Sequence, residues 1–294
     1  MDLSVCTLVR NRNRYLPALL DALARQTLAP RELIVAVAGG EDPAPLLQGA
    51  PLPVRQIDIP TPDDRIPYAD ARNAAAHAAT GDALVFLDAD CLPSATFTES
   101  LVSALGPHDA LCIGQVYYLP PDLPEEALRD ERALREAGRP HPARPVPPDT
   151  GSAASRRYEL AWGLCMALRT ATFHRLGGFD TRYGGYAGED TDLAFTCRAA
   201  GVPLRVVAGA DVFHQHHDVF EPPIHQLQAT LANAQAFHDK WGRWPMEGWL
   251  QGFADAGLVR WSPDATRATL LREPTRAEVE QARRRLAAPF RLSV

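Results

Sequence analysis

Lysine is almost absent from this sequence of 294 residues: Lys240 is the only one, and arginines supply the other basic side chains. Acidic residues outnumber basic ones, 36 to 30, and the formal net charge is -6 at pH 7. Proteins that bind nucleic acid through its phosphates carry a basic surface, and the overall charge here has the opposite sign. The composition therefore argues against nucleic acid as a partner.

Long apolar runs and ordered cysteine patterns are missing as well. The sequence has no run of the roughly 18 apolar residues that a transmembrane helix needs, so we expect no membrane span. The N-terminus enters an apolar run at Leu3 without the charged segment and cleavage site of a signal peptide. The five cysteines are irregularly spaced and indicate neither a zinc site nor a disulfide framework. We expect buried thiols in a cytoplasmic protein, with peripheral association with a membrane as the alternative location.

Strand-like and helix-like segments alternate in the first part of the chain. Strands are expected at Leu3–Val9, Glu32–Ala38, Val54–Ile59 and Ala83–Leu87, and helices at Arg14–Gln26 and Ala69–Thr80. Such alternation predicts a parallel sheet with crossover helices. Ligands of these sheets bind beyond the carboxyl ends of the strands, and Asp88 and Asp90 follow the fourth strand directly.

The later segments are less regular. Strands are expected at Ala110–Tyr118, Leu160–Arg169, Leu204–Val207 and Val212–Phe213, and helices at Leu101–Leu105, Glu125–Ala137, Asp190–Gly201 and through the tail, His225–Val294. Between residues 120 and 157 the chain is rich in proline, and from Gly138 onward we expect a mobile loop because prolines prevent regular pairing. This loop fits either a lid over the substrates or a plain surface excursion.

The acidic pair Asp88-Ala89-Asp90 is the first candidate for chemistry. Two carboxylates one residue apart at a strand end can face the same ligand if the chain turns there. Carboxylate oxygens suit Mg²⁺ or Mn²⁺, and such an ion neutralises the charge that builds on a leaving diphosphate. A solvated turn is the alternative for this segment taken alone.

A glycine-rich segment with an acidic end is the second candidate. It reads Gly184-Gly185-Tyr186-Ala187-Gly188-Glu189-Asp190-Thr191-Asp192. Acids at the start of a helix stabilise the helix dipole, which accounts for Asp192. The glycines allow the backbone to approach a ligand closely, and a carboxylate held here can take the proton from an acceptor hydroxyl.

Histidines and one arginine complete the candidates. His214, His216 and His217 fall within four residues, a grouping that indicates a metal site. In an extended segment, alternation places His214 and His216 on one face. Arg72 lies on the helix expected before the fourth strand, where it either reaches a diphosphate or base or simply covers the helix surface.

Taken in order, these segments resemble family 2 glycosyltransferases of the GT-A fold. The matching residues are Asn11-Arg12, Ala71-Arg72-Asn73, Phe86-Leu87-Asp88-Ala89-Asp90, Leu176-Gly177-Gly178-Phe179-Asp180, Gly188-Glu189-Asp190-Thr191-Asp192-Leu193 and Phe213-His214. The resemblance implies an α/β fold with a Rossmann-like mixed central sheet flanked by helices and a helical C-terminal tail. It divides the chain into a catalytic domain, 1–217, and an extension, 218–294. Within the catalytic domain, residues 1–118 would bind the nucleotide sugar, 119–157 form the proline-rich loop and 158–217 carry the acceptor site and base.

The resemblance also implies an activity: transfer of a sugar from a nucleotide-diphosphate sugar to a hydroxyl of a saccharide or other acceptor, with inversion and with Mn²⁺ or Mg²⁺. Asp190 is implied as the general base, with Glu189 beside it, and the metal ligands are Asp88, Asp90 and His214. The nucleotide sugar is expected at Thr7, Val9, Arg10, Asn11, Arg12, Arg72, Asp88, Ala89 and Asp90, and the acceptor at Trp162, Gly163, Tyr186 and Glu189. The first loop departs from the family's usual Pro-Thr-Tyr-Asn-Arg, so the nucleobase stays open.

Four other functions compete with this one. A haloacid-dehalogenase-like phosphatase would need a lysine between Asp88 and the later acids, but Lys240 comes after them. A sugar-nucleotide pyrophosphorylase would need a glycine-rich first loop, and Val9–Arg14 contains no glycine. A retaining glycosyltransferase and an inactive sugar-nucleotide-binding protein stay open, although intact Asp190 and His214 argue against the inactive form.

Overall fold

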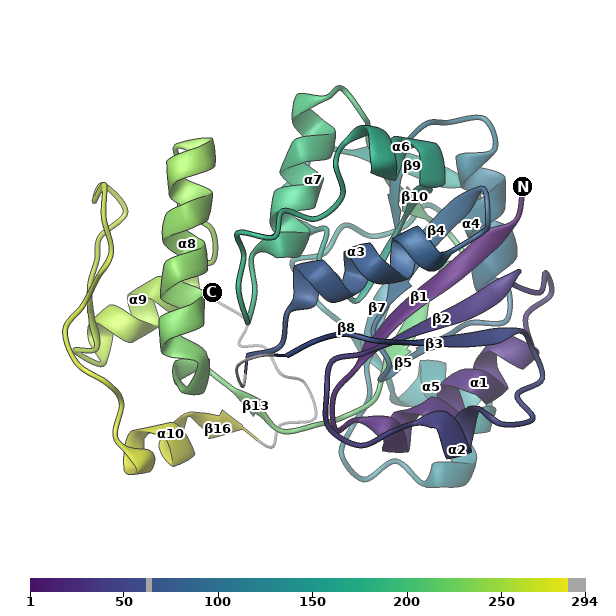
Figure 1. Cartoon of the computed structure of the whole chain (residues 1–294), viewed down its shortest axis with the longest axis horizontal. Helices are drawn as coiled ribbons and strands as arrows, with labels where there is room; N and C mark the ends of the chain where they lie inside the picture. The colour runs from purple at the N-terminus through teal and green to yellow at the C-terminus, as the bar shows by residue number, and fades with distance from the viewer. Residues whose placement is uncertain (62–64, 285–294) are drawn as a thin grey trace.

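A mixed eight-stranded sheet forms the centre of the computed structural model, which describes residues 1–61 and 65–284 (Figure 1). Its strands, in spatial order, are β3 (Val54–Asp58), β2 (Glu32–Val37), β1 (Leu3–Val9), β4 (Ala83–Leu87), β10 (Cys165–Arg169), β6 (Leu111–Ile113), β11 (Leu204–Val207) and β9 (Ser152–Ser155). The first four are parallel, whereas β10 runs antiparallel between β4 and β6. β11 is parallel to β6, and β9 is antiparallel to β11. The predicted mixed α/β sheet is confirmed.

Helices cover both faces of this sheet because strand side chains alternate between them. The helices of this part are η1 (Asn13–Tyr15), α1 (Leu16–Ala24), α2 (Ala44–Leu47), α3 (Tyr68–Ala78), α4 (Phe97–Leu105), η2 (Glu125–Arg129), α5 (Glu131–Ala137), η3 (Tyr158–Leu160), α6 (Thr170–Arg175) and α7 (Glu189–Ala199). In β4, Val85 and Leu87 join a core cluster with α1 and α4. Leu84 and Phe86 join the opposite cluster with α3 and α7. Because both faces are covered, β1, β2 and β4 are mostly apolar, and this is why the sequence marks them clearly. The edge strand β3, in contrast, is largely polar and only partly buried.

A second sheet of four strands lies beside the first. It consists of β5 (Cys91–Pro93), β12 (Val212–His214), β7 (Val116–Tyr118) and β8 (Arg139–Pro140), in that order. The single strand expected at Ala110–Tyr118 is therefore wrong: it is split into β6 and β7, which belong to different sheets. The strand is interrupted at Gly114, where the backbones pack so closely that an added Cβ atom would lie 1.5 Å from the carbonyl oxygen of Ala210.

The proline-rich segment is more regular than its composition indicates. Its residues Arg139–Pro140 form β8 against β7, and Ser152–Ser155 form β9 at the edge of the large sheet. The expectation that prolines exclude regular pairing here is wrong, because both strands lie outside the densest run of prolines. Between them the chain turns inward at residues 141–144, where Arg144 is buried.

The C-terminal part has a hydrophobic cluster of its own, which includes Trp244, Leu250 and Phe253. Its elements are β13 (Val219–Phe220), η4 (Ile224–Gln226), α8 (Leu227–Trp241), α9 (Glu247–Asp255), β14 (Val259–Arg260), β15 (Thr269–Leu270), α10 (Arg276–Ala282) and β16 (Arg283–Arg284). The helical tail is confirmed for α8, α9 and α10, but two small strand pairs accompany them, β13 with β16 and β14 with β15. Residues 285–294 of the expected tail lie outside the described residues.

Contacts between α8 and α7 join this part to the central sheet. Lys240 of α8 donates to Oδ2 of Asp192 at 2.7 Å, and the indole of Trp241 donates to Oδ1 at 2.7 Å. The rings of Phe195 and Phe237 lie edge to face at 5.1 Å. Asp192 therefore pairs with the tail, in addition to its favourable position at the start of α7.

The structure also bears on the cysteines and on the expected membrane span. All five cysteines are free and buried, as expected. None of the helices in residues 1–61 and 65–284 is long and apolar enough to cross a membrane.

Gly114 offers a test of the break between the two sheets. Gly114→Ala should destabilise the protein by about 1–3 kcal/mol or more, because the new methyl group meets backbone that cannot move without separating the strands. Gly248→Ala is the matched control, since Gly248 has open space around its Cα and lies in α9. Chemical denaturation would measure both free energies of unfolding, and a Gly114 variant as stable as the Gly248 variant would contradict this account.

Candidate active site

The candidate site lies at the carboxyl end of β4, where the two sheets meet. Asp88 and Asp90 follow β4 directly, and the chain then continues into β5. β12 pairs with β5 so that His214 lies opposite Cys91, next to Asp90. The backbone N–H of Gln215 donates to the carbonyl oxygen of Asp90 at 2.8 Å. The pairing of β12 with β5 therefore brings His214 next to Asp90, although the two residues lie far apart in the sequence.

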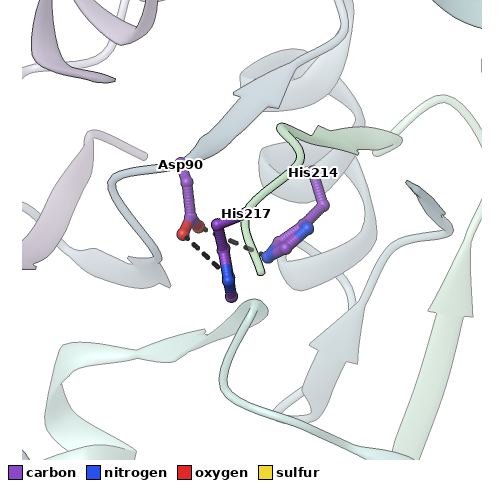
Figure 2. A group of neighbouring side chains, drawn as sticks. All are labelled: Asp90, His214 and His217. Atoms are coloured by element: carbon purple, nitrogen blue, oxygen red, sulfur yellow. Dashed lines mark ion pairs between the residues drawn. The ribbon is translucent and has the colours of Figure 1, made fainter. Parts of the chain in front are cut away.

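Asp90, His214 and His217 form a group in which the ligand atoms all lie within 4.8 Å of one another. Figure 2 shows both imidazole rings turned towards the carboxylate of Asp90. Nε2 of His214 lies 3.6 Å from Oδ1, and Nε2 of His217 lies 3.6 Å from Oδ2. Burial lowers the pKa of His214 to about 4, so at neutral pH the ring is uncharged and keeps a nitrogen lone pair for a cation.

Arg12 supplies a positive charge at this position. Its guanidinium forms an ion pair with Oδ2 of Asp90, while 44% of the arginine side chain is exposed. Asp90 itself is only 2% exposed. Arg12 therefore links the buried acid to the surface.

Arg72 connects the acidic pair to the start of α7. Its Nη2 lies 3.2 Å from Oδ1 of Asp88, and its Nη1 forms a close ion pair with Oε1 of Glu189. Burial opposes the charged form of this guanidinium, but Glu189 and Asp88 outweigh burial and raise the pKa of Arg72. Among the described residues, Asp88 is thus paired with Arg72. It does not belong to the candidate metal-binding group of Asp90, His214 and His217.

Glu189 and Asp190 differ in their surroundings although they are adjacent. Glu189 is 4% exposed, and its Oε2 has no hydrogen-bond partner within the described part of the chain. Burial and the nearby Asp190 raise the pKa of Glu189 to about 7, with Arg72 acting in the opposite direction. Asp190 is more accessible and accepts hydrogen bonds from the backbone N–H of Gly163 at 2.8 Å and of Thr191 at 2.6 Å.

The residues predicted to bind the nucleotide lie along β1 and the loop after it. Thr7 and Val9 are buried in β1, and the hydroxyl of Thr7 has no partner among the described residues. Asn11 has a positive φ of 53° and accepts from the backbone N–H of Glu41 at 3.2 Å. Arg10 follows β1 directly in this loop, and Ala89 is buried between the two acids. The loop after β1 thus reaches the acidic pair through the ion pair between Arg12 and Asp90.

The residues predicted for the acceptor lie around Asp190. Gly163 binds Asp190 through its backbone, and the indole of Trp162 donates to the carbonyl oxygen of Glu159 at 3.0 Å. Tyr186 is stacked on Trp249 of α9, with ring centroids 5.9 Å apart. The C-terminal part thus forms one wall beside the loop that ends at Glu189.

Asn233 of α8 holds that loop in place. Its side-chain amide donates to the carbonyl oxygens of Gly184, Tyr186 and Ala187, at 3.3, 3.1 and 2.8 Å. Asn233 is 2% exposed, so these bonds are shielded from water. Burial of a polar side chain with several backbone acceptors fixes the conformation of the segment it binds.

Sequence reasoning misses three residues of this region. His217 belongs to the histidine cluster, but alternation points to His216 instead, whereas the chain leaves the extended conformation after β12. Arg144 lies in the proline-rich segment, and Asn233 lies on a helix of the tail. Neither carries a local sequence signal, since both acquire their positions from tertiary contacts.

Solved structures with similar architecture define the fold. One is the crystal structure of GalNAc-T7 with UDP, GalNAc and Mn²⁺, with a TM-score of 0.57 and 16% identity over 74% of this chain and 44% of that chain. Another is S. aureus TarS 1-349 in complex with UDP-GlcNAc, with a TM-score of 0.55 and 14% identity over 87% of this chain and 80% of that chain. The fold is the GT-A fold of glycosyltransferases.

Sequence comparison then identifies the family. Residues 4–164 match the profile of Glycosyl transferase family 2, and residues 152–218 match the N-terminal domain of galactosyltransferase. The chain belongs to glycosyl transferase family 2. A similar curated protein is validoxylamine A glucosyltransferase of Streptomyces hygroscopicus subsp. limoneus, 30% identical over 223 residues, which cover 69% of this chain and 49% of that protein. The chain therefore spans about half the length of this relative.

The role of Asn233 can be tested without an activity assay. Asn233→Asp keeps the shape of the side chain but places an oxygen opposite three carbonyl oxygens. The amide hydrogens of residues 184–188 should then exchange faster, on the order of tenfold, because each lost hydrogen bond is worth about 1 kcal/mol. Gln228→Ala, at an exposed position of the same helix, should leave this exchange unchanged. Unchanged exchange in Asn233→Asp would mean that the loop is held by other contacts.

Proposed function

We propose that this protein transfers a sugar from a nucleotide-diphosphate sugar to an acceptor hydroxyl, with inversion and with a divalent cation. The observation that carries the proposal is the position of Arg72 between Asp88 and Glu189. Through this one side chain, Asp88, which lies two residues before Asp90 of the group suited to a cation, is joined to Glu189, the neighbour of the candidate base Asp190. Membership of family 2 supports the same activity.

The donor diphosphate is assigned to the end of the site formed by Arg12, Asp90 and the two histidines. Arg12 is half-exposed and carries a charge suited to phosphate oxygens. A uridine diphosphate donor is the first to test, since TarS and GalNAc-T7 have been crystallised with UDP or a UDP sugar. The first loop of this chain departs from the usual family sequence, so all four common nucleoside diphosphates belong in the comparison.

The cation is assigned to Asp90, His214 and His217, with Asp88 as a further candidate. One carboxylate and two neutral imidazoles converge there, and this donor set fits a divalent transition metal. Because imidazole nitrogens suit Mg²⁺ poorly, we propose Mn²⁺ rather than Mg²⁺ as the preferred ion. When bound, such an ion offsets the negative charge of a departing diphosphate.

Asp190 is assigned as the general base. Its hydrogen bonds from Gly163 and Thr191 fix the carboxylate at the start of α7, and its partial exposure leaves room for an acceptor. The carboxylate takes the proton of the acceptor hydroxyl while the hydroxyl oxygen attacks the anomeric carbon. Glu189 offers its unpartnered Oε2 to a hydroxyl of the acceptor, and Trp162 and Tyr186 line the same side.

The metal assignment predicts a specific pattern among the three histidines. His214→Ala and His217→Ala should each weaken Mn²⁺ binding by at least about tenfold, because each removes one of few ligands. His216→Ala is the matched control and should bind Mn²⁺ as the unmodified protein does. Titration calorimetry or the electron paramagnetic resonance signal of Mn²⁺ would measure these affinities.

Chelation gives a second readout of the same assignment. Transfer should stop in EDTA and return with added Mn²⁺, more fully than with Mg²⁺. Full activity in the presence of chelator would remove the cation from the proposal, and a loss of affinity confined to His216→Ala would place the ion elsewhere in the cluster.

Asp190→Asn separates binding from chemistry. The amide keeps the shape of the carboxylate but cannot take a proton, so donor binding should persist while transfer falls by roughly 10²–10⁴-fold, the usual contribution of a positioned base. Glu189→Gln should instead raise the acceptor KM, because it alters a hydrogen bond to the acceptor.

The product configuration decides between two mechanisms independently of these variants. Inversion at the anomeric carbon, read by NMR, is expected for single displacement with Asp190 as base. Transfer at the native rate by Asp190→Asn would place the base elsewhere, and a retained configuration would refute single displacement. Nucleotide-sugar binding without any turnover would instead identify an inactive binding protein.

A further inference from the structure

Arg144 is buried beside the candidate site, against Trp162, although it belongs to the proline-rich segment. A turn, in which the backbone N–H of Arg144 donates to the carbonyl oxygen of His141 at 3.1 Å, carries it inward. Its residue is 3% exposed, and its guanidinium lies 5.5 Å from the ring centroid of Trp162. The neighbouring His141 packs edge to face on the same indole at 4.9 Å.

Among the described residues, no acid pairs with the charge of Arg144. Nη2 donates to the carbonyl oxygen of Gly114 at 3.2 Å, but Nε and Nη1 have no hydrogen-bond partner in the described part of the chain. Within residues 1–61 and 65–284, no carboxylate forms an ion pair with it. Arg72, which is equally buried, has two such partners, Glu189 and Asp88. Burial lowers the pKa of Arg144, because the nearby groups do not offset the cost of removing its charge from water.

An unpaired buried guanidinium is unfavourable for folding. A buried polar group without a partner destabilises the folded state, and a buried charge does so more strongly. Such a side chain calls for an explanation, and a bound ligand that completes its hydrogen bonds is one.

The nitrogens of Arg144 without a partner, Nε and Nη1, belong to a side chain that packs close to the candidate base. Trp162, under the guanidinium, is followed by Gly163, whose N–H binds Asp190. Arg144 thus lies next to the segment that holds the candidate base.

We propose that Arg144 binds a negatively charged oxygen of the substrates, through Nε and Nη1. The proposal rests on the proposed function and adds a ligand group to it. Two sources share this chemistry: a phosphate oxygen of the departing diphosphate and a carboxylate on the transferred sugar. In either case the oxyanion supplies the partner that Nε and Nη1 lack among the described residues.

Arg144→Met tests the proposal, with Arg156→Met as the matched control at an exposed position of the same segment. Removing an unpaired buried charge should leave the thermal unfolding temperature of the free protein unchanged or higher. The same change should weaken binding of an oxyanion probe about tenfold to hundredfold, the usual effect of losing a charged hydrogen bond. Arg144→Lys, which keeps the charge, should recover part of the affinity.

Three probes, each titrated with Mn²⁺ into the full chain, separate the two sources: pyrophosphate, glucose-1-phosphate and glucuronate-1-phosphate. Weaker binding of all three in Arg144→Met would assign the contact to phosphate. Weaker binding of glucuronate-1-phosphate alone would assign it to a sugar carboxylate. Both results support an oxyanion site at Arg144.

Other results would overturn it. An Arg144→Met variant with a lower unfolding temperature and unchanged affinity for all three probes would mean that Arg144 has a purely structural role. So would binding of none of the probes by the unmodified protein at millimolar concentration. These measurements require no turnover, so failure to detect sugar transfer would count against the proposed function and leave the result for Arg144 intact.

Discussion

The buried guanidinium of Arg72 is the interaction on which the arrangement of the site depends. It joins Asp88, which follows the fourth strand of the sheet, to Glu189, which begins α7 about a hundred residues later in the chain. Without this positive charge, the carboxylates of Asp88, Glu189 and Asp190 would lie close together with little to offset their repulsion. An exposed ion pair contributes little to stability, but the pair of Arg72 with Glu189 is shielded from water. Through its second contact, with the 37% exposed side chain of Asp88, Arg72 connects the two halves of the site.

Much of the fold follows from local sequence. Leu3–Val9, Ala83–Leu87 and Leu204–Val207 are strands at the predicted residues, because strands that pack against helices are largely apolar. The elements that were predicted wrongly depend instead on contacts with residues far away in the sequence. The break at Gly114 depends on the backbone of Ala210, and Ser152–Ser155 forms a strand of small residues whose pairing comes from β11 rather than from its own pattern. Neither partner is visible in a local window of sequence.

The residues of the candidate site also fall into those that local sequence predicts and those that it does not. Asp88, Asp90, Glu189 and Asp190 are accessible to prediction because they stand where regular elements begin or end, and such positions are where α/β proteins place their ligands. The residues that complete them are not. A histidine three residues beyond a strand, an arginine among prolines and an asparagine on a distant helix have no local pattern, and only the path of the chain brings His217, Arg144 and Asn233 to the site.

The single lysine has a practical consequence. Lys240 lies between Asp192 and Asp180, with its Nζ 2.7 and 3.2 Å from their carboxylate oxygens. Amine-reactive reagents require an uncharged, accessible nitrogen, and two carboxylates engage this one in ion pairs. Apart from the terminal amine, acylation of the chain is therefore a direct chemical reporter of whether α8 is seated on α7. Mass spectrometry of one peptide would follow the docking of the C-terminal part onto the catalytic sheet, with no label introduced by mutation.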